Sequence, residues 1–222
     1  MEIRTEFRKK LGEIQGDILA MGSMVEKAII RSIEALKGRD LALAEQIIAD
    51  DVRINEKRYK IEDKCIRLIA TQQPMASDLR IIMSVANVVT ELERIGDHAE
   101  GIAKIVIMIG DEPPLKPIID LPRMAEKTAD MLHRSLDAFT SHDAEAARKI
   151  AVEDDEVDDL YDQVYRELLT FMAEDPKTIT RATRLIWVAH NLERSADRVT
   201  NICERVVFTV TGKIEEIGAS NY

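Results

Sequence analysis

Two pairs of acidic residues recur at the same spacing in the two halves of this 222-residue chain. Glu93 and Asp97 stand four positions apart in the segment Leu-Glu-Arg-Ile-Gly-Asp, and Glu193 and Asp197 do so in Leu-Glu-Arg-Ser-Ala-Asp. Residues four apart lie on one face of a helix, so each pair presents two carboxylates that repel one another unless a cation or a basic side chain lies between them. The recurrence therefore predicts cation binding.

Further oxygen-bearing side chains share these helix faces or fall on the helices expected beside them. The full set of candidate ligands is Glu93, Asp97, Glu100, Glu193, Asp197, Asn201, Glu204, Asp51, Asp154 and Asp158. Carboxylates with a few amide oxygens, and without a Cys or His set, suit hard or borderline cations such as Mg²⁺, Mn²⁺ or iron rather than a structural zinc. We therefore expect metal ions as the cofactor.

Two alternatives remain beside a metal-binding regulator. In the first, the protein is purely structural, and Arg94, Lys104 or basic groups on the next helix neutralise the acidic pairs, as happens on most solvated helix faces. In the second, it is a metal-dependent enzyme, but the sequence has no Glu-x-x-His pair of the kind that di-iron carboxylate enzymes use. It also has no Gly-rich phosphate loop and no nucleophilic Ser or Cys set. We do not expect an enzyme.

The elements that must position these residues are long helices. Apolar residues recur at steps of three and four from Leu11 to about Gly38, again between Asp40 and Pro74, and again up to Gly110. Asp40 is a suitable N-cap for the second of these helices. Aromatic residues make up only 4% of the chain, and helix-forming types dominate. The fold class predicted is all-α.

The second half of the chain repeats this plan after a Pro-rich segment at positions 110–117. Asp143 in the second half corresponds to Asp40 in the first, and Asp154 corresponds to Asp51, each 103 positions later in the chain. The acidic pairs repeat 100 positions later. Each amphipathic helix must bury its apolar stripe, and short loops make consecutive helices antiparallel neighbours. We therefore expect two tandem three-helix bundles, residues 1–112 and 113–222, with six long antiparallel helices and a pseudo-twofold internal repeat.

Charge and hydropathy restrict the partners and the location. The formal net charge of −10 argues against a nucleic-acid-binding surface, which needs a basic stripe. The N-terminus lacks the apolar core of a signal peptide, and no apolar stretch approaches the roughly 20 residues that cross a bilayer. We expect a cytoplasmic protein that does not bind nucleic acid.

The sequence resembles the PhoU family of bacterial phosphate-transport accessory and regulatory proteins over nearly its whole length. The resemblance rests on positions 92–97, 131–139, 191–198 and 201–204. It implies a pair of three-helix bundles, and it implies metal ions, including multinuclear iron or zinc clusters, at the two acidic motifs. The metals to consider are iron, zinc, manganese and magnesium.

The same resemblance implies a biological role. Proteins of this kind repress the phosphate-starvation response by linking the ATPase of a phosphate-specific ABC transporter to a membrane sensor histidine kinase, and a homodimer is expected on the same ground. This sequence departs from the usual motifs in two places. Ser195-Ala196 replaces the more usual Ile-Gly in the second motif, and His98 follows the first. Neither departure removes a candidate ligand.

Overall fold

Helices account for nearly all of the structure. A computed structural model describes residues 2–217, with side chains from residue 5 onward. The elements are α1 (Glu2–Gly38), α2 (Leu41–Gln72), α3 (Ala76–Ile109), α4 (Asp120–Ser141), α5 (Ala144–Ala151), α6 (Asp154–Glu174), the short 3₁₀ helix η1 (Pro176–Thr178) and α7 (Ile179–Thr211). The described part of the chain contains no strand, so the all-α prediction is confirmed. No helix within it is long and apolar enough to cross a membrane.

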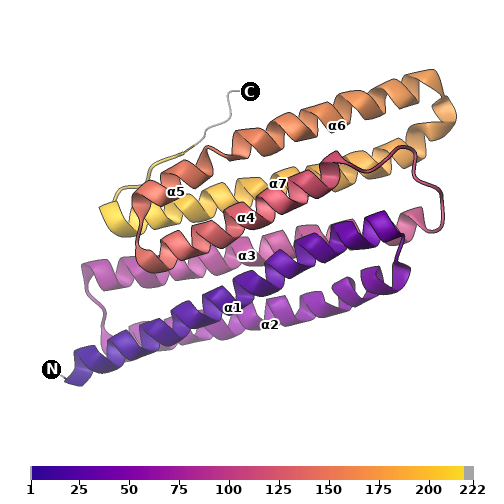
Figure 1. Cartoon of the computed structure of the whole chain (residues 1–222). Coiled ribbons are helices and arrows are strands. Elements are labelled where there is room, and N and C mark those ends of the chain that lie inside the picture. Colours follow the sequence, from indigo (N-terminus) through magenta and orange to yellow (C-terminus); the bar gives the residue numbers. More distant parts are fainter. Residues whose placement is uncertain (1, 218–222) are drawn as a thin grey trace.

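The helices form two groups that pack against each other (Figure 1). Helices α1 to α3 form one group and α4 to α7 the other, with the Pro-rich segment between them. Helices α3 and α7 lie side by side and antiparallel, since Ser84 contacts Thr209 and His98 contacts Ser195 across them. The buried apolar side chains of both groups form one continuous core. The division into two units at residue 112 stays a prediction.

The N-termini of α2 and α5 show the internal repeat in atomic detail. The carboxylate of Asp40 accepts a hydrogen bond from the backbone N–H of Leu43 at 2.9 Å, and that of Asp143 accepts one from Ala146 at 2.9 Å. Each bond satisfies a backbone donor that has no partner within its helix. The N-cap predicted at Asp40 is confirmed, and its counterpart has the same geometry.

The prediction of six long helices is confirmed, and the fifth of them is divided into α5 and α6 by the two residues 152 and 153. Beside this break the carboxylate of Glu153 receives a hydrogen bond from Arg134 at 2.8 Å and one from Lys127 at 2.8 Å, both from α4. Hydrogen bonding by Arg134 is the main reason that the pKa of Glu153 falls to about 2. The matching pair in the first group, Arg31 and Asp50 at 3.1 Å, lies beside a continuous α2.

Candidate functional site

The first acidic cluster lies between α2 and α3. Asp51 projects from α2 toward three carboxylates of α3, those of Asp97, Glu100 and Glu93. Burial, and then the negative charge of these neighbours, raises the pKa of Asp51 to about 6. Its Oδ2 accepts a hydrogen bond from Asn55 at 2.7 Å, but the buried Oδ1 has no hydrogen-bond partner among the described side chains. The structure thus brings four of the predicted residues together around an unsatisfied carboxylate oxygen.

Gly96 allows α2 and α3 to approach closely at this cluster. A Cβ atom at this position would lie 3.2 Å from Cδ1 of Ile54 and 3.4 Å from Oδ1 of Asp51. A side chain would therefore occupy the space against which the Asp51 carboxylate rests. A small cavity of about 140 Å³ adjoins the carboxylate, with Arg31 in its wall. The first cluster therefore has room beside its unsatisfied oxygen.

Basic side chains already neutralise part of the first cluster. Nη1 of Arg58 donates to Glu93 at 2.8 Å while its Nε donates to Glu62 at 2.9 Å, and Nζ of Lys104 lies 2.6 Å from Glu100. The sequence suggested Lys104 by name, and Arg58 is one of the basic groups that it suggested on a neighbouring helix. The signal for Arg58 was its position seven residues after Asp51, which places both on one face of α2. The first cluster therefore contains ion pairs of the kind expected if the protein were purely structural.

The second acidic cluster lies between α6 and α7. Its members are Asp154 and Asp158 from α6 and Glu193 and Asp197 from α7. Burial is the main cause that raises the pKa of both Asp154 and Glu193 to about 7, and the charges of the other carboxylates raise it further. Oδ1 of Asp154 and Oε2 of Glu193 are buried without a hydrogen-bond partner. The structure again brings four predicted residues together.

No Lys or Arg among the described residues forms an ion pair with these four carboxylates. The repeat places Tyr161 where the first half has Arg58, and Glu204 where it has Lys104. Nδ1 of His190 lies 3.2 Å from Oε2 of Glu193 without hydrogen-bonding geometry, and burial lowers the pKa of this imidazole, which favours its neutral form. The charges of Arg198 and Arg194 act against the raised pKa of Asp197, but neither guanidinium forms an ion pair with it among the described residues. The second cluster therefore carries more uncompensated negative charge than the first.

Two predicted ligands point elsewhere. Asn201 donates to Glu91 of α3 at 3.3 Å, and Glu204 accepts from the backbone N–H of Ile217 at 3.0 Å. Eleven residues separate Glu204 from Glu193, which returns it to the same helix face but about 16 Å further along the axis. Asn201 follows Glu193 by eight residues, which places it about 80° away from Glu193 around the helix axis. Neither residue therefore lies with the carboxylates of the second cluster.

The clusters do not form a finished coordination sphere. Within residues 2–217, no group of three or more His, Cys, Asp or Glu side chains has an arrangement that holds a metal ion as it stands. The oxygens that lack partners and the raised carboxyl pKa values nevertheless show that each cluster favours an added positive charge. By charge and donor type, both clusters fit an oxygen-ligated cation.

The two departures from the usual motifs contact each other across α3 and α7. Nδ1 of His98 lies 3.2 Å from Oγ of Ser195, and this hydroxyl donates its proton to the carbonyl oxygen of Asn191 at 2.7 Å. The Ser195 oxygen therefore accepts from Nδ1–H of a neutral imidazole. Burial is the main cause that lowers the pKa of His98 to about 4, which keeps the ring neutral. One hydrogen bond thus joins the two acidic motifs.

Replacing Ser195 by Ala is expected to destabilise the chain by about 1–3 kcal/mol, because it leaves the buried Nδ1–H of His98 without an acceptor. Urea unfolding monitored by circular dichroism measures the change. Ser141→Ala is the matched control, since that hydroxyl also donates to a helix carbonyl but is exposed. Equal losses in the two variants would contradict the role of the His98 contact.

Comparisons with known proteins give one consistent result. The sequence matches the family model described as PhoU domain over residues 18–106 and 121–206. It is 40% identical over 211 residues to the phosphate-specific transport system accessory protein PhoU homolog of Clostridium acetobutylicum, covering 95% of this chain and 96% of that protein. It is 36% identical to the Escherichia coli protein named phosphate-specific transport system accessory protein PhoU, covering 95% of this chain and 88% of that protein.

Solved structures agree with the sequence comparisons. The crystal structure of the phosphate transport system regulatory protein PhoU from Streptococcus pneumoniae superimposes with a TM-score of 0.89 at 34% identity, covering 95% of this chain and 100% of that chain. PhoU from Pseudomonas aeruginosa superimposes with a TM-score of 0.88 at 37% identity, covering 93% of this chain and 100% of that chain. The agreement extends over both helix groups, so the similarity is not confined to one half.

Proposed function

This chain belongs to the PhoU family, and from that premise we propose that it is a cytoplasmic, metal-binding adaptor that regulates phosphate uptake. Its relatives are named accessory or regulatory proteins of phosphate transport, which supports a regulator rather than an enzyme. We propose as partners the ATPase of a phosphate ABC transporter and a sensor histidine kinase. The chain would act negatively on the phosphate-starvation response and work as a homodimer.

Deletion of the gene in its host tests this role. The expected result is that starvation-response genes are expressed even when phosphate is plentiful, because the negative coupling is lost. The intact chain supplied from a plasmid is expected to restore repression, and an affinity-tagged chain is expected to copurify with the transporter ATPase and the kinase from solubilised membranes. Normal repression in the deletion strain would overturn the regulatory proposal.

We propose that the cations bind at the two acidic clusters. The observation that carries this proposal is that Asp51 and Asp154, which occupy the same position in the two repeats, each have a buried Oδ1 without a hydrogen-bond partner. The proposed ligands are Asp51, Glu93, Asp97 and Glu100 in the first cluster and Asp154, Asp158, Glu193 and Asp197 in the second. Iron, zinc, manganese and magnesium are the cations to test. A bound cation would offset carboxylate repulsion and tie α2 to α3, or α6 to α7.

We further propose that the two clusters differ in affinity. In the first, a cation must compete with Arg58 for Glu93 and with Lys104 for Glu100. In the second, the carboxylates have no such ion pairs among the described residues. The free energy of cation binding is therefore more favourable between α6 and α7. The second cluster should fill first as the metal concentration rises.

A further inference from the structure

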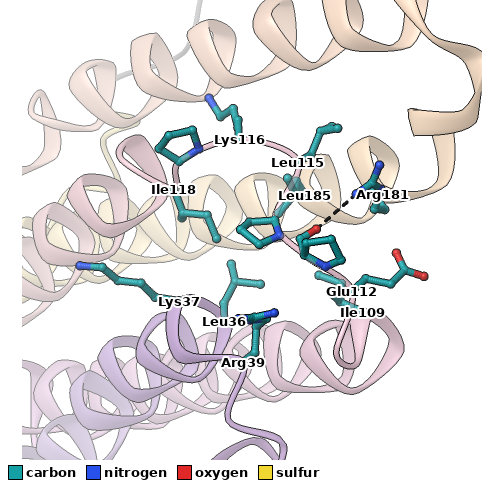
Figure 2. Close-up of a pocket in the computed structure, with 13 residues that line it drawn as sticks. Leu36, Lys37, Arg39, Ile109, Glu112, Leu115, Lys116, Ile118, Arg181 and Leu185 are labelled. Atoms are coloured by element: carbon teal, nitrogen blue, oxygen red, sulfur yellow. Dashed lines mark hydrogen bonds between the residues drawn. The ribbon is translucent and has the colours of Figure 1, made fainter.

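An apolar pocket of about 270 Å³ lies beneath the loop between α3 and α4, residues 110–119, which contains the Pro-rich segment, and none of the proposed metal ligands lines the pocket. It is bounded by the C-terminal ends of α1 and α3 and by the first turns of α7. Figure 2 shows Leu115 and Ile118 of the segment on one side of the pocket and Leu36 of α1 on the other. The volume is close to the lower end of the range for small-molecule sites, roughly 300 Å³.

The walls of this pocket are aliphatic. They consist of side chains that favour contact with hydrocarbon: Leu36, Ile109, Pro113, Pro114, Leu115, Pro117, Ile118 and Leu185. No aromatic ring is present among the lining residues, so the pocket offers no surface on which a nucleobase would stack. The walls therefore favour an alkyl chain over a nucleotide.

Two guanidinium groups at the pocket have no carboxylate partner among the residues whose side chains are described. Nη1 of Arg39 donates to the backbone oxygen of Asp111 at 3.5 Å, and Nη1 of Arg181 donates to that of Pro113 at 3.3 Å (Figure 2 shows the second bond). A guanidinium has five N–H donors, so each group keeps donors for another acceptor. Lys37, which also lines the pocket, forms no ion pair within the described residues.

The remaining charged residues of the lining are already paired. Lys116 forms an ion pair with Glu167 of α6, and the single acidic residue of the lining, Glu112, lies 3.8 Å from Nη1 of Arg184. The pocket as a whole therefore has a positive surplus, although the chain has a net charge of −10. Positive charge beside apolar walls is complementary to an anion that carries a hydrocarbon chain.

We propose that this pocket binds a small amphipathic anion, an aliphatic carboxylate whose chain lies against the apolar walls and whose head group is held by Arg39 and Arg181. The planar fork of a guanidinium matches the two oxygens of a carboxylate. Burial of each methylene group adds to the affinity, which makes chain length a determinant of binding. Because the pocket has walls from α1, the Pro-rich segment and α7, the ligand would bridge the two helix groups.

Isothermal titration of the full-length protein with decanoate tests this proposal. The expected dissociation constant is below about 1 mM. Decanol, which has the chain without the charge, and acetate, which has the charge without the chain, are each expected to bind at least about tenfold more weakly. Absence of decanoate binding at millimolar concentrations, or equal binding of decanol, would overturn the proposal.

Two variants locate the site. The double variant Arg39→Gln/Arg181→Gln is expected to weaken decanoate binding at least about tenfold, whereas Arg67→Gln/Arg166→Gln, which removes two exposed arginines elsewhere, should change it less than about twofold. Leu115→Trp fills the pocket without altering its charge and is expected to weaken binding to a similar extent. Melting curves establish that each variant is folded. Loss of binding in the arginine variant but not in Leu115→Trp would indicate surface ion pairing and would refute the pocket.

Discussion

Replacing Asp154 by Asn and Glu193 by Gln is expected to remove most of the stabilisation that added Mn²⁺ or Fe²⁺ gives to the metal-free chain. Within the described part of the chain, both side chains have a buried oxygen without a hydrogen-bond partner, and their cluster has no ion pair with Lys or Arg. A ligand at 100 times its dissociation constant stabilises a folded chain by about 2.7 kcal/mol. Urea unfolding with and without the metal, together with elemental analysis of the dialysed protein, measures the loss.

The matched control is Asp51→Asn/Glu93→Gln in the first cluster, which is expected to remove a smaller part of the stabilisation by added metal. In the unmodified chain, this stabilisation should also be weaker at pH 5 than at pH 8. The pKa values of Asp154 and Glu193 are about 7, so both carboxyls are protonated at pH 5 and must lose protons to bind a cation. Equal losses from the two double variants would contradict the proposed order of affinity, and unchanged metal content would contradict the ligand assignment.

Arg58 and Tyr161 occupy the same position in the two repeats, and exchanging them is expected to exchange the cation affinities of the two clusters. Tyr161→Arg should weaken cation binding between α6 and α7 by at least about tenfold, and Arg58→Tyr should strengthen it between α2 and α3 by a similar factor. A unit charge at about 5 Å contributes about 3 kcal/mol at an effective dielectric constant of about 20, which solvent screening reduces at these half-exposed positions. Competition with a metal-sensitive dye gives the two affinities.

Each exchange needs a control for folding, because Arg58→Tyr also removes the ion pairs with Glu93 and Glu62. Circular dichroism spectra should remain those of the unmodified chain. Arg58→Gln serves as a second variant that removes the charge without adding an aromatic ring, and it should also strengthen binding. If Arg58→Tyr and Arg58→Gln both left the affinity of the first cluster unchanged, competition by Arg58 would not be the cause of the difference.

Local signals accounted for the C-terminal ends of the first three helices. Helix α1 ends at Gly38, α2 ends two residues before Pro74, and α3 ends immediately before Gly110, as the sequence predicted. These signals act within a few residues: proline cannot donate to a helical hydrogen bond, and glycine adopts a positive φ angle without strain, as Gly110 does at +62°. The positions of the boundaries therefore need no knowledge of tertiary contacts.

The features that the sequence did not reveal depend on contacts between distant segments. The interruption between α5 and α6 accompanies ion pairs of Glu153 with Arg134 and Lys127, which lie on another helix. The hydrogen bond between His98 and Ser195 depends on the antiparallel packing of α3 against α7. Periodicity within one helix contains no information about either contact.

The acidic clusters were predictable in part. The repeat offset correctly placed Asp51 and Asp154 next to the motif carboxylates, because equivalent helices meet at equivalent faces. The inclusion of Asn201 and Glu204 was based on spacing along α7 alone and ignored the distance along the helix axis. Helical spacing identifies a shared face, but only the position of the neighbouring helix decides which part of that face belongs to one site.

The interruption between α5 and α6 gives the two clusters different backbone surroundings. Asp154 is the first residue of α6, whereas Asp51 is in the interior of α2, so the second cluster lies at a helix end. A helix N-terminus stabilises a nearby anion by only about 0.3–1 kcal/mol. Burial and the neighbouring carboxylates outweigh this effect, because they raise the pKa of Asp154 to about 7, above the value of about 6 for Asp51. A single backbone break thus makes two copies of one duplicated site structurally distinct while their acidic residues stay in place.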